Sequence, residues 1–491
     1  MRHAVAMVVV SAGAMVVEIV AARMLAPLVG MTVFSWTAVI ATVLAGLSAG
    51  HWIGGIVADR EPARLGARLF QMLVATALLT TTPVLLVAPV HAAAEAFGLG
   101  WMAATVTVAG LCFVLPSLLA GAVTPVLTAA AVAGAPGRTG LVIGRMFALG
   151  AAGAILGTML AGFVLLQWVG SIGSLAVVAA AEAAVAALFL RDLRAPVVGA
   201  LVVAGVLAGS GAPLLAAPYC RVESRYYCLD LVDTTAWAGF PSRGMFLDGW
   251  IQSVEPTDGS DRLAIEAHAF LDAWARRRHG PGDAWRAFFI GGGGYSLPTR
   301  WVARWPQVEA VVAEIDPAVT AFAAEIGFRR ASGRIKVRDD DARSVLRRDA
   351  ARYDLVFSDA FSGHTMPAHL VTVEFHRLVR DRLEPGGVYA INAYDWARDP
   401  RFLSAMLRSL RQVFAAVTVW RSDTGPIRPG GRTPYILLAS QGRLDPTPVT
   451  EAGVTEAGGG RSWTVRPAPP ATADAPVLTD DYAPVDRLTL R

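Results

Sequence analysis

The chain has 491 residues, of which 54% are hydrophobic and only 17% charged, and its mean hydropathy is +0.48. Such values are unusual for a soluble protein and ordinary for one that lies partly in a membrane. The formal net charge of +4 comes from dispersed arginines. No basic stripe with interleaved aromatic residues is present, so nucleic acid is excluded as an expected partner.

The apolar residues are concentrated in the first 217 positions, where seven segments stand out. These segments are 4–28, 32–57, 69–90, 101–133, 140–168, 172–190 and 196–217. Most of them reach the ~20 residues that a helix needs to cross about 30 Å of hydrocarbon. A cleaved signal peptide would explain one short stretch and not seven. The sequence therefore predicts a multi-pass transmembrane domain of about seven helices over residues 1–217, with the lipid bilayer as its partner and the cell membrane as its location.

Arginines distinguish alternate loops of this region. They occur at the N-terminus and in the loops 58–68, 134–145 and 191–194. The loops near 28–32, 91–100 and 168–173 contain none. Because arginine-rich loops remain in the cytoplasm, seven crossings place everything after residue 217 on the extracytoplasmic side.

Two of the three cysteines follow the last apolar segment. Cys220 and Cys228 are close enough in sequence to form a disulfide in an oxidising compartment, or they are two unrelated thiols. No cluster of histidine and cysteine accompanies them, so no metal is expected.

The second half of the chain alternates short apolar runs with helical patterns, which indicates an α/β fold. A small β unit is expected over 218–262, an α/β domain over 263–440, and a Pro/Gly-rich linker and C-terminal tail over 441–491. Strands are predicted near 287–290, 308–313, 334–338, 353–358, 388–392, 415–420 and 434–439. Helical crossovers between them predict a seven-stranded, mostly parallel Rossmann-like sheet, whose ligand site forms at the carboxyl ends of the strands.

Glycines follow the first of these strands in the stretch AFFIGGGGYS, which contains Gly291, Gly292 and Gly293. A loop without side chains lets a ligand approach the backbone closely. Glu314 follows the second strand, with Asp316 two residues later. At that distance from the glycines a carboxylate can accept hydrogen bonds from both hydroxyls of a ribose.

Further carboxylates follow the third and fourth strands. Asp341 and Ala342 come after the third, where a carboxylate can accept a hydrogen bond from an adenine amino group, and Asp359 comes after the fourth. The ordered set of glycines, ribose acid, adenine acid and a further aspartate predicts a site for a nucleoside of the S-adenosylmethionine type.

The motifs LDGWIQ, FFIGGGG, AEIDP, RDDDA, YDLVFSDAFSG and EFHRLVRDRLEPGGVYAIN occur in this order. Over about residues 220–440 they resemble the spermidine synthase (polyamine aminopropyltransferase) family. With the preceding helices, the chain resembles the membrane-bound spermidine synthase-like proteins of bacteria. The resemblance implies a small β domain on a methyltransferase-type Rossmann domain, with decarboxylated S-adenosylmethionine as donor and an amine such as putrescine as acceptor. A homodimer through the soluble domain is left open.

The resemblance also implies roles for individual residues. Glu314 would hold the ribose, Asp341 the adenine, and Asp359 would accept the proton of the attacking amine, a task that suits a positioned carboxylate. Gln252, in LDGWIQ, belongs to the expected donor site.

The chain departs from the family at several positions of the polyamine half of the site. Gly294 stands where the soluble enzymes carry an aspartate, and Ser362 replaces a second acid. Tyr227 occupies the position of a family glutamine, and a family tyrosine is replaced near Ile265.

Three classes of function therefore follow from the sequence: a membrane-anchored aminopropyltransferase, an S-adenosylmethionine-dependent methyltransferase, and a non-catalytic nucleoside-binding membrane protein or transporter partner. Gly294 favours the second class, because it removes the acid that would repel a donor carboxylate. The extracytoplasmic side favours the third, because these donors are made in the cytoplasm, so the side of the α/β domain stays open.

Overall fold

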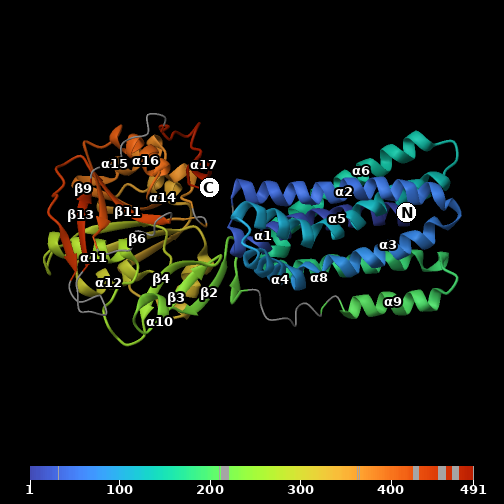
Figure 1. Cartoon of the computed structure of the whole chain (residues 1–491), viewed down its shortest axis with the longest axis horizontal. Coiled ribbons are helices and arrows are strands. Elements are labelled where there is room, and N and C mark those ends of the chain that lie inside the picture. The colour runs from blue at the N-terminus through green and yellow to red at the C-terminus, as the bar shows by residue number, and fades with distance from the viewer. Residues whose placement is uncertain are drawn as a thin grey trace. The chain divides into compact units, whose positions relative to one another are not determined.

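The computed structural model describes residues 1–30, 32–209, 211, 220–361, 363, 365–423, 431–451, 461–466 and 475–489. The chain divides into two compact units (Figure 1), a helical unit from Met1 to Arg225 and an α/β unit from Tyr226 to Arg491. Each unit has hydrophobic core clusters of its own.

The helical unit contains nine described α-helices, three short turns of other helix types, and a two-residue strand. The α-helices are α1 (Arg2–Val29), α2 (Val33–Arg60), α3 (Leu65–Thr80), α4 (Pro83–Ala96), α5 (Trp101–Ala133), α6 (Thr139–Leu160), α7 (Leu166–Trp168), α8 (Gly170–Ala186) and α9 (Pro196–Gly209). The other elements are η1 (Pro62–Arg64), η2 (Ala161–Leu165), η3 (Ala187–Asp192) and β1 (Val222–Glu223).

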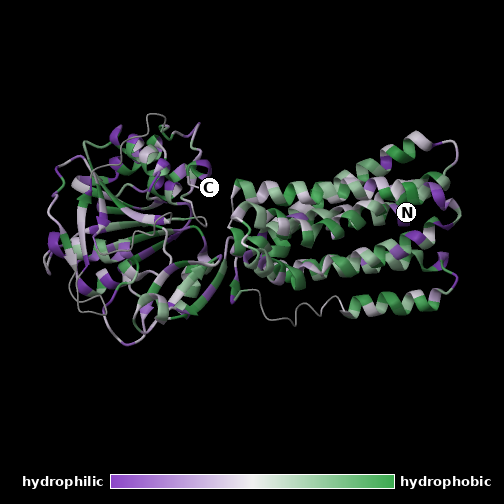
Figure 2. Cartoon of the chain, viewed as in Figure 1, coloured by the Kyte–Doolittle hydropathy of each residue, from purple (hydrophilic) through white to green (hydrophobic). Residues whose placement is uncertain are grey.

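Within the described residues, five helical stretches are long and apolar enough to cross a membrane. A sixth results if Pro62–Thr80 and Pro83–Ala96, which meet at a bend of 52°, form one broken span. The sequence predicts about seven; the difference is α9, whose 14 described residues fall short of a full span. Large apolar side chains such as Phe147 (80% exposed) and Trp52 (77% exposed) lie on the surface of the bundle. The helices of this unit are predominantly hydrophobic along their length (Figure 2). An aqueous surface would carry polar residues there, so this face suits lipid.

Glycines allow the helices to pack backbone against backbone. A Cβ at Gly50 of α2 would lie 2.1 Å from the carbonyl oxygen of Leu118 in α5, and one at Gly157 of α6 would lie 2.2 Å from that of Ala12 in α1. Small residues at helix crossings are the usual way in which membrane helices associate closely.

Three buried or partly buried polar contacts connect segments of this unit that are distant in the sequence. Glu182 of α8, which is 1% exposed, accepts a hydrogen bond from the Thr80 hydroxyl of α3 at 3.0 Å. At the end of the unit, the Glu223 carboxylate accepts a hydrogen bond from the Ser171 amide at 2.9 Å, and Arg23 donates to the Ser224 carbonyl oxygen at 3.1 Å. Residues 223–224 therefore lie beside the start of α8, at the bundle end whose loops contain no arginine.

Cys220 and Cys228 are both disulfide-bonded, whereas Cys112 in α5 is a free, buried cysteine. Of the two alternatives that the sequence leaves open, the structure thus has the disulfide.

The α/β unit begins with a small antiparallel sheet, in the region where the sequence predicts a β unit. Its strands are β2 (Cys228–Asp233), β3 (Ser242–Leu247) and β4 (Trp250–Pro256), and α10 (Thr235–Ala238) precedes β3. The turn between β3 and β4 has positive φ angles at Asp248 (46°) and Gly249 (76°). This turn reverses the chain tightly and directs Gln252 and Ser253 of β4 toward the glycine loop described below.

The main sheet has nine strands in the order β12-β13-β10-β11-β9-β8-β5-β6-β7. They are β5 (Arg286–Ile290), β6 (Glu309–Glu314), β7 (Ile335–Asp339), β8 (Tyr353–Ser358), β9 (Leu383–Trp396), β10 (Ala416–Ser422), β11 (Arg432–Ser440), β12 (Val449–Glu451) and β13 (Arg461–Arg466). Strands β5 to β9 pair in parallel, and β9–β11, β11–β10, β10–β13 and β13–β12 pair antiparallel.

The prediction of seven strands is wrong by two among the described residues, and the sheet is mixed, with four parallel and four antiparallel pairings, where the sequence predicts a mostly parallel one. Strands β12 and β13 lie in the segment 441–491 that the sequence analysis assigns to a linker and tail, and α17 (Val485–Thr489) lies there too. Trp463 in β13 is 0% exposed and stacks edge to face on Phe270 at 5.8 Å between ring centroids. Burial of this tryptophan stabilises β13, although the Pro- and Gly-rich composition around it predicts no strand.

Helices cover both faces of the sheet. They are α11 (Glu266–Arg278), α12 (Ser296–Arg304), α13 (Pro317–Glu325), α14 (Ala342–Arg348), the short η5 (Ala368–Leu370), α15 (Val373–Asp381) and α16 (Arg401–Arg411). Phe288 and Ile290 of β5 belong to a core shared with α14, α15 and α16. Phe289, between them, points to the other face and contacts Trp301 of α12 at 5.5 Å between ring centroids. This alternation follows from the two-residue repeat of a strand.

The chain reverses its direction of travel across the sheet at β5. From β5 it moves to β6 and β7, and then returns to β8 on the other side of β5. In sheets of this kind ligands bind at the carboxyl ends of the strands at such a reversal. The loops after β5 and β8, which contain Gly291 and Asp359, meet at this point.

Candidate active site

The glycine loop after β5 lies directly against the loop after β8. The Gly291 amide donates to the Ala313 carbonyl oxygen at 2.9 Å, and the Asp359 amide donates to the Ile290 carbonyl oxygen at 3.0 Å. Gly291 and Gly293 have φ angles of 93° and 47°, which other residues rarely adopt. The loop therefore presents backbone and no side chains at the switch point, the place at β5 where the chain reverses its direction across the sheet. The sequence predicts this for Gly291, Gly292 and Gly293.

Glu314 ends β6 and holds this loop in place. One carboxylate oxygen accepts from the Gly292 amide at 2.8 Å, and the other accepts from the Asp316 amide at 3.0 Å. Burial raises the pKa of Glu314 above its usual range, against the effect of these hydrogen bonds. Asp316 caps α13 by accepting from the Ala318 amide at 3.0 Å, so it positions the turn after β6.

Asp341 and Ala342 start α14 at the same edge of the sheet. Asp341 caps this helix, accepting from the Ser344 amide at 2.9 Å, and its second oxygen lies 2.7 Å from Nε2 of His369. Burial tends to raise the pKa of Asp341, but the hydrogen bonds from His369 and Ser344 hold this pKa below its usual range. An ionised carboxylate at this place can accept a hydrogen bond from an exocyclic amine.

Asp359 is fixed through both carboxylate oxygens. Oδ2 lies 2.9 Å from Nε2 of His268 on α11, and Oδ1 accepts from the Asn392 side-chain amide of β9 at 2.7 Å. His268 is 7% exposed, and its ring meets Phe357 edge to face at 6.2 Å between centroids. A histidine and an amide from two elements therefore aim one carboxylate, which is the arrangement that a positioned proton acceptor requires.

His268 is a site residue that the sequence does not predict, because no helix is predicted over residues 266–278. The sequence does contain a signal for this helix. Glu266 lies in the first turn of α11 and three arginines occupy its last turn, and this charge distribution favours a helix.

A cavity of about 610 Å³ lies in front of Asp359. Its lining residues include Trp237, Trp250, Gln252, Ile265, Glu266, Asp359, Phe361, Asn392, Tyr394, Arg421 and Arg432. Gln252 and Asp359 are thus brought together, and a Cβ at Gly293 would lie 3.7 Å from that of Gln252. Glu314, Asp316 and Asp341 do not line this cavity; they lie on the other side of the glycine loop, along β6 and β7.

Gly294 has no space for the side chain that the family carries there. A Cβ at this position would lie 2.5 Å from Cβ of Ser253 and 2.9 Å from Cδ2 of Phe328. The Gly294 amide donates to the Ser253 hydroxyl at 2.8 Å. Ser253 and Phe328 thus occupy the space beside Gly294. Ile265 lines the cavity in the place of a family tyrosine, and Ser362 lies outside the described residues.

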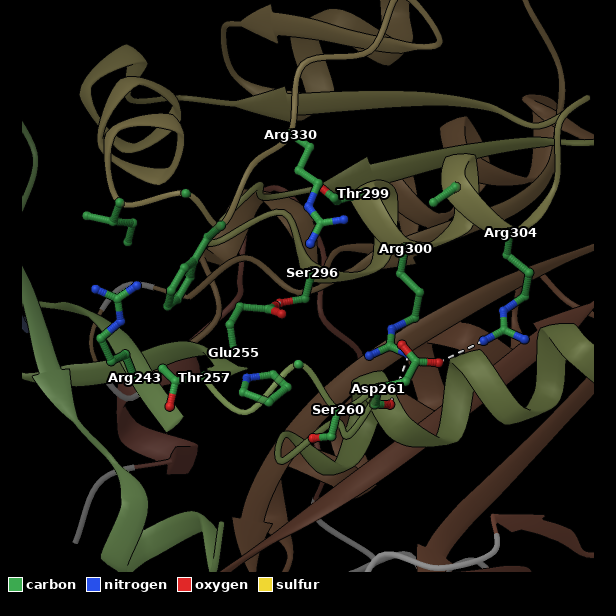
Figure 3. A pocket seen from close by; sticks show the side chains of 16 residues that line it. Arg243, Glu255, Thr257, Ser260, Asp261, Ser296, Thr299, Arg300, Arg304 and Arg330 are labelled. Atoms are coloured by element: carbon green, nitrogen blue, oxygen red, sulfur yellow. Dashed lines mark hydrogen bonds and ion pairs between the residues drawn. The ribbon is translucent and has the colours of Figure 1, made fainter. Parts of the chain in front are cut away.

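A second cavity, of about 450 Å³, lies beside α12 (Figure 3). Its charged lining residues are Arg243, Glu255, Asp261, Arg300, Arg304 and Arg330. Asp261 forms ion pairs with Arg300 and Arg304. Burial raises the pKa of Glu255, whose carboxylate accepts a hydrogen bond from the Ser296 hydroxyl. None of the predicted site residues lines this cavity, so the candidate active site is the one that contains Asp359.

The chain resembles known proteins, and the family match lies in the α/β unit. Residues 284–440 match the family described as "Spermine/spermidine synthase domain". "Polyamine aminopropyltransferase 2" of Pseudomonas aeruginosa is 32% identical over 189 residues, which are 37% of this chain and 52% of the relative. "Polyamine aminopropyltransferase" of Vibrio vulnificus is 31% identical over 128 residues, 26% of this chain and 43% of the relative. The crystal structure of a probable spermidine synthase from Corynebacterium glutamicum covers 53% of this chain and 95% of its own at 22% identity, with a TM-score of 0.44.

A mixed sheet with its polar site at the switch point defines a Rossmann-like α/β domain. Residues 284–440 of this domain match the spermine/spermidine synthase family, so the chain is similar to spermidine synthases over this part. The resemblance to spermidine synthases that the motifs predict is thus confirmed for this domain. The chain spans about half the length of the first curated relatives, 43% and 52%.

Proposed function

We propose that this protein is a membrane-anchored transferase that moves an aminopropyl group from decarboxylated S-adenosylmethionine to an amine. The observation that carries the proposal is the placement of Asp359. Its carboxylate lines a cavity large enough for a small amine, is aimed by His268 and Asn392, and lies against the glycine loop at the switch point. A proton acceptor thus stands between the expected donor site and an open cavity.

In this proposal the residues along β5, β6 and β7 hold the donor. The backbone of Gly291, Gly292 and Gly293 takes the nucleoside, Glu314 accepts from the ribose hydroxyls, and Asp341 with Ala342 meets the adenine. The carboxylates of Glu314 and Asp341 are both at the carboxyl edge of the sheet, as this arrangement requires. Gln252 flanks the reacting end, next to Gly293.

The transfer needs one proton acceptor and no acid. The lone pair of the amine nitrogen attacks the methylene carbon of the aminopropyl group, the bond between carbon and sulfur breaks, and its electron pair stays on sulfur. The products are a neutral thioether, methylthioadenosine, and a protonated secondary amine, whose proton passes to Asp359. Holding donor and amine in line lowers the entropic part of the barrier, and His268 and Asn392 keep the acceptor oxygen in place.

The test is product formation by the purified full-length protein in lipid nanodiscs. Incubation with decarboxylated S-adenosylmethionine and a panel of amines should release methylthioadenosine, which mass spectrometry detects together with the aminopropylated amine. Asp359→Asn keeps the size of the side chain and should lower the rate by at least ~10²-fold, the usual range for a lost general base. If the wild type binds the nucleoside but releases no more methylthioadenosine than Asp359→Asn, the proposal is wrong.

A methyltransferase is the second candidate, and Gly294 favours it. Because Ser253 and Phe328 fill the space around Gly294, no acid stands there to repel the carboxylate of S-adenosylmethionine or to bind the amine of its decarboxylated form. The same assay with S-adenosylmethionine labelled in its methyl group separates the candidates. Transfer of the label to an acceptor, without release of methylthioadenosine, would support the methyltransferase instead.

We further propose that the helical unit spans the cell membrane and that the α/β unit lies outside the cytoplasm. Three observations support this topology: the arginines of alternate loops, the position of residues 223–224 at the bundle end whose loops lack arginine, and the disulfide of Cys220 and Cys228. Positive loops stay in the cytoplasm, and disulfides persist in oxidising compartments.

Reporter fusions test the topology. A reporter after Arg194 should be cytoplasmic and one after Arg491 external, and alkylation of the untreated protein should leave Cys220 and Cys228 unmodified until a reductant is added. If both fusions report the cytoplasm, the topology is wrong, and the α/β unit lies on the side where the donor is made.

A further inference from the structure

The cavity in front of Asp359 contains two arginines that the reaction above does not use. Arg421 is near the end of β10 and Arg432 is at the start of β11, and both line the cavity. A cavity that receives a diamine would be expected to carry carboxylates instead, since these stabilise an ammonium group at each end.

The order of the strands assigns these arginines to the acceptor. The predicted donor residues follow β5, β6 and β7, on one side of β8 and Asp359, whereas Arg432 and Arg421 are on β11 and β10, on the other side. Strand β9 lies between β8 and β11, so the backbones of β8 and β11 are about 10 Å apart at a spacing of about 4.8 Å per strand. Arg432 stands opposite Trp396, the last residue of β9. The two arginines therefore line the cavity on the side of Asp359 away from the predicted donor residues.

Both guanidinium groups keep donors for a ligand. Arg432 donates to the Tyr394 carbonyl oxygen at 2.9 Å, and Arg421 contacts the Tyr435 hydroxyl. The buried Nε atoms of both arginines have no hydrogen-bond partner among the described residues, and neither arginine forms an ion pair there. A planar guanidinium with free donors matches a carboxylate or phosphate, which it can bind through two parallel hydrogen bonds.

The acids of the cavity do not offset these charges fully. Asp359 is already bonded to His268 and Asn392. Glu266 accepts from the Ser422 amide at 3.1 Å, and burial raises the pKa of its carboxyl, so its negative charge is disfavoured. Asp395 of β9 interacts electrostatically with Arg432, and burial raises the pKa of its carboxyl to about 6. The wall formed by β10 and β11 still carries two guanidinium groups, so a second ammonium group placed against them would be repelled.

We propose that the acceptor is an amine that also carries an anionic group, as an ω-amino acid does, with the amine at Asp359 and the anion on Arg421 and Arg432. This inference rests on the proposed transfer to an amine and narrows its substrate class. It separates this protein from one that uses putrescine, whose two ends are both cationic.

The first experiment compares two acceptors of equal length. Full-length protein in nanodiscs, saturated with methylthioadenosine, is titrated calorimetrically with 4-aminobutanoate and with putrescine, and longer ω-amino acids follow. The amino acid should bind at least tenfold more tightly than putrescine. Arg421→Gln and Arg432→Gln should each reduce this preference at least tenfold. Arg330→Gln, an arginine of the second cavity, should leave it unchanged, and unfolding temperatures show whether each variant is folded.

The outcomes separate this inference from the proposed function. Tighter binding and faster turnover of putrescine, unaffected by Arg432→Gln, would overturn the inference and leave aminopropyl transfer standing. If neither acceptor yields methylthioadenosine but the amino acid still binds in an arginine-dependent way, the proposed transfer fails and the anion site stands. If both arginine variants weaken S-adenosylhomocysteine and spare its decarboxylated analogue and 4-aminobutanoate, the anion belongs to the donor, and the acceptor assignment is wrong.

Discussion

Restoring an acid at position 294 should destabilise this protein and should not improve its donor site. A Cβ at Gly294 would lie 2.5 Å from Cβ and 2.7 Å from Oγ of Ser253, and 2.9 Å from Phe328. Both neighbours are buried, at 1% and 6% exposure, so neither can move into solvent. Overpacking of this kind costs about 1–3 kcal/mol, and loss of the hydrogen bond from the Gly294 amide to Ser253 adds about 1 kcal/mol. Gly294→Asp should therefore lose roughly 2–4 kcal/mol of unfolding free energy.

The assay is thermal unfolding of the full-length protein, followed by tryptophan fluorescence. A domain of this size loses about 2–4 °C for each kcal/mol, so the midpoint should fall by roughly 4–16 °C. The double variant Gly294→Asp/Ser253→Gly removes the two nearest atoms and should recover at least half of this loss. A single variant that unfolds at the wild-type temperature and binds decarboxylated S-adenosylmethionine more tightly would refute the reasoning, since it would show that the space exists.

Three further predictions concern the site and its support. Glu314→Ala should abolish nucleoside binding in calorimetry with S-adenosylhomocysteine, because two charge-assisted hydrogen bonds to the ribose, at about 1.5–3 kcal/mol each, are lost; unchanged affinity would rule out this pocket. His268→Phe should lower kcat by about 10²-fold, since it frees Asp359 to rotate, and should leave the acceptor KM near its wild-type value, with partial rescue in His268→Gln; a change in KM alone would contradict a positioning role. Burial raises the pKa of Asp395 to about 6, above its unfolded value, so the folded state binds the extra proton and stability should fall, by up to about 3 kcal/mol, as the pH rises from 4 through 6. Asp395→Asn should flatten this profile, and an unaltered slope would assign it to another group.

Much of the fold can be predicted because buried strands leave a local signal. Strands β5 to β11 are short apolar runs between turn residues, and the helices between them follow a regular period. Several elements escape this signal, and strand β13 and helix α11 show why. Strand β13 is short and amphipathic within a Pro- and Gly-rich region, and its stability comes from burial of Trp463 against Phe270, a contact between distant parts of the chain. Helix α11 contributes His268 and is recognised only from its charged ends.

The donor half of the site can be predicted for the same reason. Gly291, Glu314 and Asp341 each follow a parallel strand, so chain order alone brings them to one edge. The environment of Gly294 cannot be predicted in this way, because Ser253 and Phe328 reach it from a separate sheet and from the end of another helix. Arg432 escapes prediction as well. It stands at the start of an antiparallel strand, and the rule about carboxyl ends does not apply there.

The strand order has a consequence for how this protein can change. Donor residues follow β5 to β7, and the arginines of the acceptor wall belong to β10 and β11, with Asp359 between the two groups. In the proposed reaction, the donor residues of 286–342 and the arginines of 416–440 belong to separate stretches of chain on either side of Asp359. Substitutions in the later stretch can alter the accepted amine without disturbing the nucleoside. Exchange of residues 416–440 between relatives should therefore transfer the preference for an acceptor, while the preference for the donor stays unchanged.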